Sequence, residues 1–279
     1  MSENIDKIFT KHFEAEVHTA YQRTGSKLRN MVRTKNNIKG ATAVFQKVGK
    51  GTASTKARHG LVPVMSMDFT PVECNLYDYY AGDWVDSLDE LKTNVDERQV
   101  VAAAGAYALG RKTDELIINA LSDASNSVGD YSTGISKSLI LQAFAKINAQ
   151  DVPDDGQRFG LVGVNQWNEL LNIKEFSDSD YVGEDLPWLN GTESRKWLGI
   201  VWLMHTGLTL NNTKERDCYI FHKTAVGHAS GQDVKSDITW HGDHAANFIS
   251  NSMSQGACLI DNTGIVKIKC DDTATLVEA

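Results

Sequence analysis

The chain has 279 residues, of which 41% are hydrophobic and 23% are charged, a composition typical of globular proteins. It has no apolar run of the ~18–20 residues that a membrane-spanning helix requires, and its polar N-terminus does not have the apolar stretch of a secretory signal. We therefore expect a protein that is soluble and intracellular at synthesis and has no contact with a membrane.

Charge is distributed unevenly along the chain. Residues 1–60 hold twelve basic and four acidic side chains, a net charge of +8, and because the whole chain has a net charge of -8, residues 61–279 carry -16. Between Val17 and Met67 there is no Asp or Glu. The ten basic residues of this stretch are Arg23, Lys27, Arg29, Arg33, Lys35, Lys39, Lys47, Lys50, Lys56 and Arg58.

This basic segment can meet the acidic body of another copy of the chain, or an external polyanion such as nucleic acid. A solvated basic tail is the third possibility. Apolar residues such as Phe9, Phe13 and Tyr21 argue against full disorder of the segment.

The first predicted elements belong to an arm and a hairpin. In residues 4–21 apolar side chains recur every three or four positions, which predicts a helix with one narrow apolar stripe, suited to docking on another surface. Residues 34–60, rich in Lys, Thr and Gly, predict an extended arm that runs into a long hairpin. Residues 61–85 have strand character and predict its returning limb, with Pro63 and Pro71 tolerated only at edges or irregularities.

The longest helix signal follows. Asn94 and Glu97 form a capping pair ahead of Val95–Asp123, which predicts a helix of about 28 residues, or ~42 Å. Gly105 and Gly110 lie inside it, and each costs about 1 kcal/mol relative to Ala. Either the helix breaks there or close packing offsets the loss.

The remaining elements alternate between helices and strands, so the predicted fold class is α+β. Ser136 is expected to cap a helix through Ile147, and Asn165 to cap a short helix that carries Trp167. Residues 174–196 are polar and predict a surface loop. Strands are expected at 159–164, 200–204, 218–222, 225–228, 257–260 and 265–270, the last two joined by the turn Asp261–Gly264.

Few patterns in the chain point to chemistry. The densest group of potential ligands is His241, Asp243 and His244, and a zinc or iron enzyme centred on them is an alternative, although no H-E-x-x-H or C-x-x-C pair accompanies them. Phosphate loops and a G-x-S-x-G elbow do not occur in the sequence. The adjacent carboxylates Asp114 with Glu115 and Asp154 with Asp155 are interpreted as helix-surface and turn residues. We expect no cofactor and no catalytic residue.

Two further sets of residues, one aromatic and one of cysteines, could take part in binding or chemistry. Tyr77, Tyr79, Tyr80 and Trp84 could stack on single-stranded nucleic acid, but neighbouring acidic residues such as Asp78 and Asp83 would repel phosphates, which favours a core or intersubunit strand. The cysteines, without C-x-x-C spacing, are expected to be reduced and mostly buried. They are Cys74, Cys218, Cys258 and Cys270.

The order of these elements resembles the major capsid proteins of tailed bacteriophages, which share the HK97-like fold. Along the chain, the predicted order is a docking helix and basic arm, a two-stranded extension, a long helix, a mixed α/β lobe and a closing C-terminal hairpin. The stretch Leu139–Leu171, which holds the sequence Asp151-Val-Pro-Asp-Asp-Gly-Gln-Arg158, is similar to the helix, loop, strand and helix of that family's axial domain. Ala257–Ile268 is similar to its closing peripheral strands.

The resemblance implies four parts. Residues 1–45 would be the N-terminal arm, 46–85 the extended loop, 86–135 with 250–279 the peripheral domain and its spine helix, and 136–249 the axial domain. It also implies self-assembly into pentamers and hexamers of an icosahedral shell that encloses double-stranded DNA nonspecifically. An encapsulin-like compartment, and a nucleic-acid-binding protein that uses residues 23–58, remain as alternatives.

Partners follow from the same resemblance. No long charged helical segment precedes the arm, so a separate scaffolding protein is expected, together with a portal and a possible decoration protein. The subunit would be made in the host bacterial cytoplasm and end in the virion capsid. The predicted intersubunit contacts are the ten basic residues of the arm and loop, together with Tyr77, Tyr79 and Trp84.

Overall fold

The computed structural model describes residues 25–86, 88, 97–177, 194–208, 210–212 and 214–274. The predicted helix at 4–21, Arg23 and the predicted cap Asn94 lie outside these residues. The chain divides into two compact units. The first unit is formed by Met1–Gly25, Asp78–Arg111 and Asp233–Met253, and the second by Ser26–Tyr77, Lys112–Gln232 and Ser254–Ala279.

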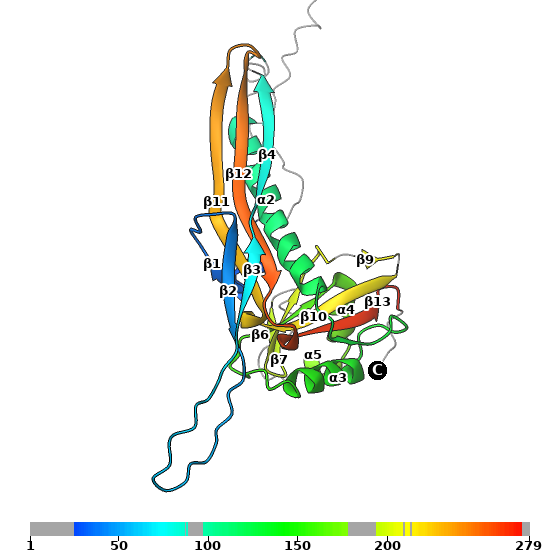
Figure 1. Ribbon diagram of the computed structural model, residues 1–279. Helices are drawn as coiled ribbons and strands as arrows, with labels where there is room; N and C mark the ends of the chain where they lie inside the picture. The colour runs from blue at the N-terminus through cyan, green and yellow to red at the C-terminus, as the bar shows by residue number, and fades with distance from the viewer. Residues whose placement is uncertain are drawn as a thin grey trace, which may run out of the picture. The chain divides into compact units, whose positions relative to one another are not determined.

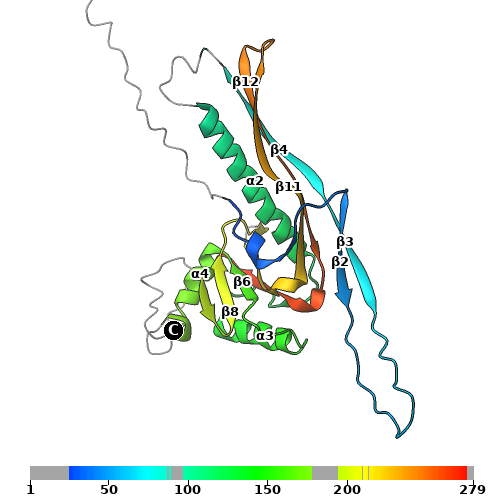
Figure 2. The same ribbon diagram turned by 90° about the vertical axis from the view of Figure 1, so that its left-hand side faces the viewer.

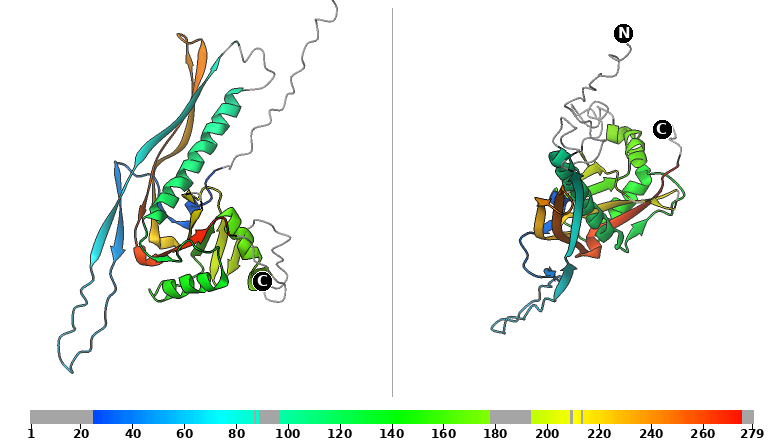
Figure 3. Two further views of the ribbon diagram at one scale, coloured as in Figure 1. Left: turned by 90° about the vertical axis from the view of Figure 1, so that its right-hand side faces the viewer. Right: turned by 90° about the horizontal axis from the view of Figure 1, so that it is seen from above.

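Long strands and a long helix build the first unit. The sheet that supplies its strands has the order β1-β11-β12-β4, and β11 and β12 continue into the second unit. Figures 1 and 3 show the N-terminal part of helix α2 running alongside the strands of this unit. The bounds are β4 Tyr77–Asp86, α2 Glu97–Ser122, β11 Val226–His241 and β12 Ala246–Leu259.

Helix α2 runs without a break through both of its glycines, which confirms the predicted spine helix. A Cβ on Gly105 would lie 2.1 Å from Nδ2 of Asn251, and a Cβ on Gly110 would lie 2.8 Å from Cα of Gly25. Asn251 of β12 is buried and donates to the backbone oxygen of Ala81 on β4 (3.3 Å). Close approach of the backbone is therefore what offsets the low helix propensity of glycine here.

A mixed sheet forms the centre of the second unit. Among the described residues it has seven strands, in the order β5-β13-β10-β6-β8-β7 with β9 beside β10. Strand β10 is antiparallel to β13 and β6, and β6 is parallel to β8. The bounds are β5 Ser127–Val128, β6 Arg158–Val162, β7 Arg195–Trp197, β8 Ile200–Met204, β9 Leu210–Asn211, β10 Glu215–His222 and β13 Ile265–Asp271.

The two faces of this sheet bury different cores because successive side chains of a strand point to opposite sides. Cys218 and Ile220 face one core, whereas Tyr219 and Phe221 face the other. The first core is covered by three helices, of which α3 and α4 are labelled in Figure 2. They are α3 Lys137–Asn148, α4 Val164–Leu171 and α5 Lys174–Ser177. The second core is completed by Leu121 of α2 together with other residues of that helix and of the segment after Gly25.

Three local predictions can be compared with these elements. Ser136 caps α3 as expected, because its Oγ accepts from the backbone nitrogen of Leu139 (3.3 Å). Asn165 as a cap is wrong: α4 begins one residue earlier and Gly163 is its cap. The expected C-terminal hairpin is also wrong, because β12 pairs in the sheet with β11 and β4, whereas β13 pairs with β10 and β5. The turn Asn262–Gly264 passes the chain from one sheet to the other.

The predicted hairpin exists, but its paired part is shorter than expected. Strand β2 (Thr42–Val48) is antiparallel to β3 (Phe69–Asn75), with Val48 opposite Phe69. Residues 49–68 form an open loop, drawn in blue in Figure 1, so strand structure at 61–68 is wrong. Pro63 lacks the N–H that a ladder needs, and β4, which follows β3 almost directly, pairs with β12 instead.

Before the hairpin, the basic segment folds against the second unit. A short 3-10 turn, Arg29–Met31, leads into β1 (Arg33–Lys35), which is parallel to β11 with Arg33 opposite Gly227. Leu28 and Val32 on either side of the turn are buried. The start of the described arm is thus part of the fold and not a solvated tail.

Candidate interaction surfaces

The loop at the end of the β2–β3 hairpin carries apolar side chains that the described residues leave in solvent. Leu61 is 95% exposed and Val64 is 92% exposed. The neighbouring exposed apolar residues are Val62, Met65, Met67 and Phe69. We call residues 61–69 the apolar limb. A run of exposed apolar side chains of this size marks a surface that another molecule covers.

The base of the hairpin is fixed to the second unit. Phe45 and Cys74 are fully buried in a small core that the hairpin shares with Ala229 and Ile260. On the surface, Lys47 Nζ lies 2.8 Å from Oδ1 of Asp261. The hairpin therefore combines an anchored base with an exposed loop.

Lysines of the hairpin lower the pKa values of two carboxylates. Burial raises the pKa of Asp261, but hydrogen bonds from Lys47 and Thr263 outweigh it, and the net pKa is lowered. Lys50 Nζ lies 2.6 Å from Oδ2 of Asp151, and this hydrogen bond lowers the pKa of Asp151. The Lys50–Asp151 pair is solvent-exposed and the Lys47–Asp261 pair is partly buried, so the first contributes little to stability because water screens it.

The predicted contact cations do not gather at one place. Lys35 donates to the carbonyl oxygen of Val44 (2.6 Å), and its Nζ lies 5.0 Å from the ring centroid of Phe45. The guanidinium of Arg33 lies 5.7 Å from the same centroid, and Arg29 donates to Oδ1 of Asn36 (3.2 Å). The exposed side chains among these cations are those of Lys27, Arg33, Lys39, Lys50, Lys56 and Arg58. Several cations thus have partners in their own chain, and the exposed ones are distributed between the arm and the loop.

Asp114, interpreted from the sequence as a helix-surface residue, is instead fully buried. Its carboxylate accepts four hydrogen bonds, from Ser26 Oγ (2.5 Å), the backbone nitrogens of Lys27 (3.2 Å) and Leu28 (3.1 Å), and His205 Nε2 (3.0 Å). Neighbouring Glu115 is exposed and pairs with Lys112, as a surface residue should. We call this arrangement the Asp114 hub.

The Asp114 hub joins the base of the arm, helix α2 and the segment after β8. Burial raises the pKa of Asp114, but the hydrogen bonds, led by that of His205, outweigh it and lower the net pKa. His205 Nδ1 accepts from the backbone nitrogen of Gly207 (3.1 Å), which assigns the proton of a neutral ring to Nε2, facing the carboxylate. Every hydrogen-bonding atom of this imidazole therefore has a partner.

The other adjacent carboxylates match their interpretation as turn residues. Asp155 Oδ1 accepts from the backbone nitrogen of Gln157 (3.0 Å), the bond of an Asx turn, and lies 3.1 Å from His222 Nε2.

An aromatic cluster occupies the first unit where β4 meets the β11–β12 hairpin. The ring of Trp84, 45% exposed, lies 4.7 Å from His244, 4.7 Å from Phe248 and 5.2 Å from His241 between centroids. Tyr77 is exposed and Tyr79 half-buried.

This cluster includes the histidines of the metal alternative. Asp243 Oδ2 lies 3.5 Å from His244 Nε2, in the turn after β11. Within the described ranges no group of three or more His, Cys, Asp or Glu side chains is arranged to hold a metal. The histidines pack against Trp84 instead.

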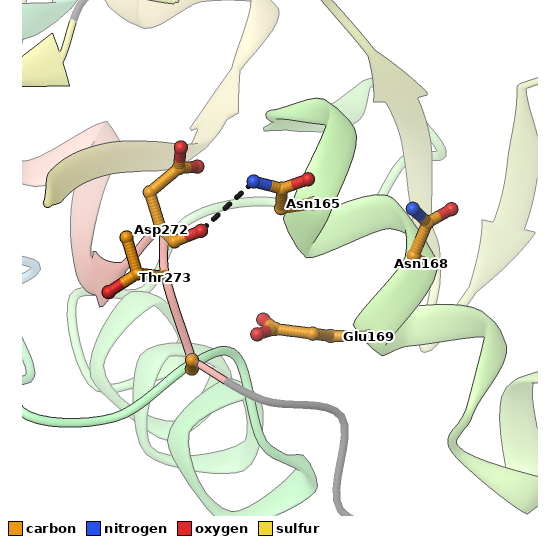
Figure 4. Close-up of a pocket in the computed structure, with 6 residues that line it drawn as sticks. Asn165, Asn168, Glu169, Asp272 and Thr273 are labelled. Carbon is orange, nitrogen blue, oxygen red and sulfur yellow. Dashed lines mark hydrogen bonds between the residues drawn. The ribbon is translucent and has the colours of Figure 1, made fainter.

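A polar pocket of about 240 Å³ lies beside helix α4 (Figure 4). It is lined by Asn165, Asn168, Glu169, Asp272, Thr273 and Ala274. Figure 4 shows the Glu169 carboxylate pointing from α4 toward the segment that holds Asp272 and Thr273.

The two carboxylates of this pocket have opposite protonation tendencies. Burial, with the charges of Asp272 and Asp271, raises the pKa of Glu169 to about 7, although its Oε2 accepts from the backbone nitrogen of Ile135 (2.6 Å). Burial also acts on Asp272, but Arg216, 2.5 Å away, outweighs it and lowers the pKa of Asp272. The pocket thus holds one charged carboxylate and one that takes up a proton near neutral pH.

No helix among the described residues has both the length and the apolar character needed to cross a membrane.

Comparisons with known proteins agree on one class. The family model described as phage capsid protein matches residues 5–272. The comparison with curated proteins gave no match.

Solved structures similar to this chain come from several phages. A chain of Mycobacterium phage Che8 is 18% identical with a TM-score of 0.75, and the match covers 97% of this chain and 99% of that one. The capsid of cyanophage P-SCSP1u is 17% identical with a TM-score of 0.73, covering 97% and 95%. The capsid of Ralstonia phage GP4 is 12% identical with a TM-score of 0.71, covering 96% of each chain.

Proposed function

This chain belongs to the phage capsid protein family and has the HK97-like fold, and on this premise we propose that it is the major capsid protein, which assembles with copies of itself into an icosahedral shell around double-stranded DNA. Membership of the family makes it a structural component of the virion capsid. Pentamers and hexamers are the proposed units of the shell, formed in the host cytoplasm.

The observation that carries the proposal is the apolar limb on its anchored hairpin. Burying an exposed Val or Leu side chain contributes about 1.5–3 kcal/mol, and a shell repeats the same contact in every subunit. We propose that the limb of one subunit lies on the body of its neighbour. The hairpin's fixed base supports this assignment, because an anchored loop loses less conformational freedom on binding than a free tail.

Charge complementarity is the second proposed contribution. Lys56 and Arg58 extend from the same loop, and residues 61–279 carry a net charge of -16. A cationic loop that meets an anionic neighbour gains specificity and a faster association rate more than raw affinity. The contact set named from the sequence, including Arg23, Tyr77 and Trp84, is retained as a proposal.

The four-part division is likewise proposed. The two compact units do not follow its bounds, because residues 233–253 group with 78–111, whereas 254–279 group with 112–232. A separate scaffolding protein, a portal and a possible decoration protein complete the proposed partners.

A matched pair of loop variants tests the role of the apolar limb. We expect Val64→Asp to leave the subunit folded, because Val64 is 92% exposed, and to abolish assembly, because a charge would have to be buried at the contact. Ser54→Asp adds the same charge to the exposed outgoing limb of the same loop and should still assemble. Circular dichroism measures folding, and sedimentation with electron microscopy measures assembly.

Several outcomes would contradict the proposal. Wild-type protein that stays monomeric at high concentration and low salt would argue against a shell subunit. Normal particles from Val64→Asp would remove the apolar limb from the contact.

Nucleic-acid binding is the second candidate, favoured by the exposed Lys56 and Arg58 in a segment without acidic residues. It predicts duplex binding by the unassembled chain, with an affinity that falls steeply as salt rises. Particles that contain protein and no DNA after expression with a packaging system would favour the encapsulin-like alternative.

A further inference from the structure

The four cysteines form two pairs of neighbouring thiols, and all four are free. Cys74 and Cys258 lie in one small core, and Cys218 and Cys270 lie together in the core under the helices, so that the thiols of each pair influence one another. The fold brings Cys74 and Cys258 together from positions far apart in the chain.

Cys74 and Cys258 connect the hairpin to the body of the second unit. Cys74 is on β3 and is fully buried, whereas Cys258 is on β12 and is half-buried, in the same small core. The chains meet closely beside them, since a Cβ on Gly256 would lie 2.0 Å from the carbonyl oxygen of Asn75 and 3.4 Å from Cys74 Sγ.

Both cysteines pack in the core that includes Ala229 of strand β11. The backbone N–H groups of Ala229 and Gly227, two residues apart on that strand, contact Cys74 and Cys258 respectively. The thiol–thiol hydrogen bond, followed by burial, raises the pKa of Cys258, and the same bond lowers the pKa of Cys74. Cys74 is thus the thiol closer to the thiolate form that attacks a disulfide.

We propose that Cys74 and Cys258 form an intrachain disulfide under oxidising conditions, which fastens the β2–β3 hairpin to strand β12. The oxidant is a small-molecule disulfide, such as oxidised glutathione. Cys258, the more accessible of the two, loses its proton to solvent and attacks as the thiolate, which forms a mixed disulfide and releases one thiol; its raised pKa makes this first attack the slow step. The Cys74 thiolate then attacks Cys258 Sγ, the mixed bond breaks, and a second thiol leaves, so two protein thiols are oxidised and one disulfide is reduced to two thiols.

The Cys218–Cys270 pair is an internal control. Cys218 is opposite Ile268 and Cys270 is opposite Arg216 in the antiparallel ladder, so the two cysteines are diagonal neighbours. Diagonal positions are about 7–8 Å apart, beyond the ~4.4–6.8 Å between Cα atoms that a disulfide spans. Both thiols are also fully buried. This pair therefore stays reduced under the same conditions.

The disulfide is a property of the single chain, and its consequence for a shell rests on the proposed function. A subunit synthesised in a reducing cytosol assembles with a hairpin that is held only by noncovalent contacts. A particle released into an oxidising medium acquires a covalent tie at each hairpin. Oxidation after assembly thus makes the shell harder to dissociate.

Mass spectrometry on the purified, unassembled full chain tests the disulfide. The protein is treated with oxidised glutathione, unfolded in the presence of N-ethylmaleimide, digested and mapped. We expect peptides that contain residues 74 and 258 to be linked, and Cys218 and Cys270 to be alkylated. Thermal unfolding should show an increase in Tm of about 5 °C or more on oxidation of the wild type, and no increase for Cys258→Ser.

Cys258→Ser changes a half-buried thiol, so it should fold. Wild-type chain in which Cys74 and Cys258 are both alkylated after oxidation would overturn the disulfide, as would an equal gain in Tm for Cys258→Ser. Oxidised particles should also need more urea to dissociate than reduced ones. A linked chain that forms no particles would leave the disulfide standing and contradict the proposed function instead.

Discussion

Replacement of Asp114 by Ala should destabilise the subunit strongly, although Asp114 is one of two adjacent acidic residues in a long helix. The change removes the acceptor of four hydrogen bonds. Ser26 Oγ and the Lys27 nitrogen are partly exposed and can turn to water, but the Leu28 nitrogen and His205 Nε2 are buried.

The size of the effect follows from those two buried donors. A buried donor without a partner costs about 1–3 kcal/mol, so two of them reduce the free energy of unfolding by about 2–6 kcal/mol. For a chain of this length, this reduction corresponds to a decrease in Tm of about 10 °C. Urea titration of the unassembled subunit, followed by circular dichroism, measures the difference.

Glu115→Ala is the matched control for this variant. It removes an exposed carboxylate whose partner is Lys112 (2.6 Å), and such pairs contribute about 0.3–0.5 kcal/mol. The folded-state pKa of Asp114 is lowered, so its contribution is present at neutral pH and is lost only as pH falls through that pKa, below the usual Asp range. Equal unfolding free energies for the two variants at neutral pH would refute the role assigned to the Asp114 hub.

Two further predictions concern Glu169 and Gly256. Because the pKa of Glu169 is raised to about 7, the folded state binds more protons than the unfolded state between pH ~4.5 and 7, and wild-type stability should fall as pH rises through this window. Glu169→Gln should lose that slope in Tm measured from pH 5 to 8, and an unchanged slope would contradict the assignment. Gly256→Ala should reduce stability by about 1–3 kcal/mol in urea titration, because its Cβ would lie 2.0 Å from the Asn75 oxygen. Gly242→Ala, in an exposed turn where the nearest atom is 3.8 Å away, should change it little, and equal effects would be evidence against close packing at Gly256.

The sequence predicted elements whose signals are local. Helix α3 was found because Ser136 provides a cap and Ile140, Ala143 and Ile147 follow at helical spacing. The length and composition of residues 95–123 predict the spine helix. The sequence does not explain its two glycines, because their close neighbours Asn251 and Gly25 are apparent only in the structure.

The outer part of strand β11 was missed for a physical reason. Val226 and the next four residues of β11 are buried, but residues 232–240 are exposed on both faces. A strand that has solvent on both faces carries no apolar alternation, so periodicity does not reveal it.

Asp114 shows the same limit at the candidate site. In the sequence of the helix, Asp114 cannot be told apart from Glu115. The two carboxylates differ in their hydrogen-bond partners, and those of Asp114 include Ser26 and His205, 88 and 91 residues away. No local pattern records contacts at that separation. Cys74 and Cys258 are likewise adjacent only in the fold, so spacing along the chain did not pair them.

The apolar limb also affects how the unassembled subunit behaves in solution. Leu61 and Val64 expose apolar side chains that can associate with a correctly placed subunit or with an aggregate. For isolated subunits, ordered assembly therefore competes with precipitation. Apolar association weakens on cooling. Cold, dilute storage should therefore keep single subunits in solution, whereas warming a concentrated stock should turn it cloudy unless ordered growth is quicker.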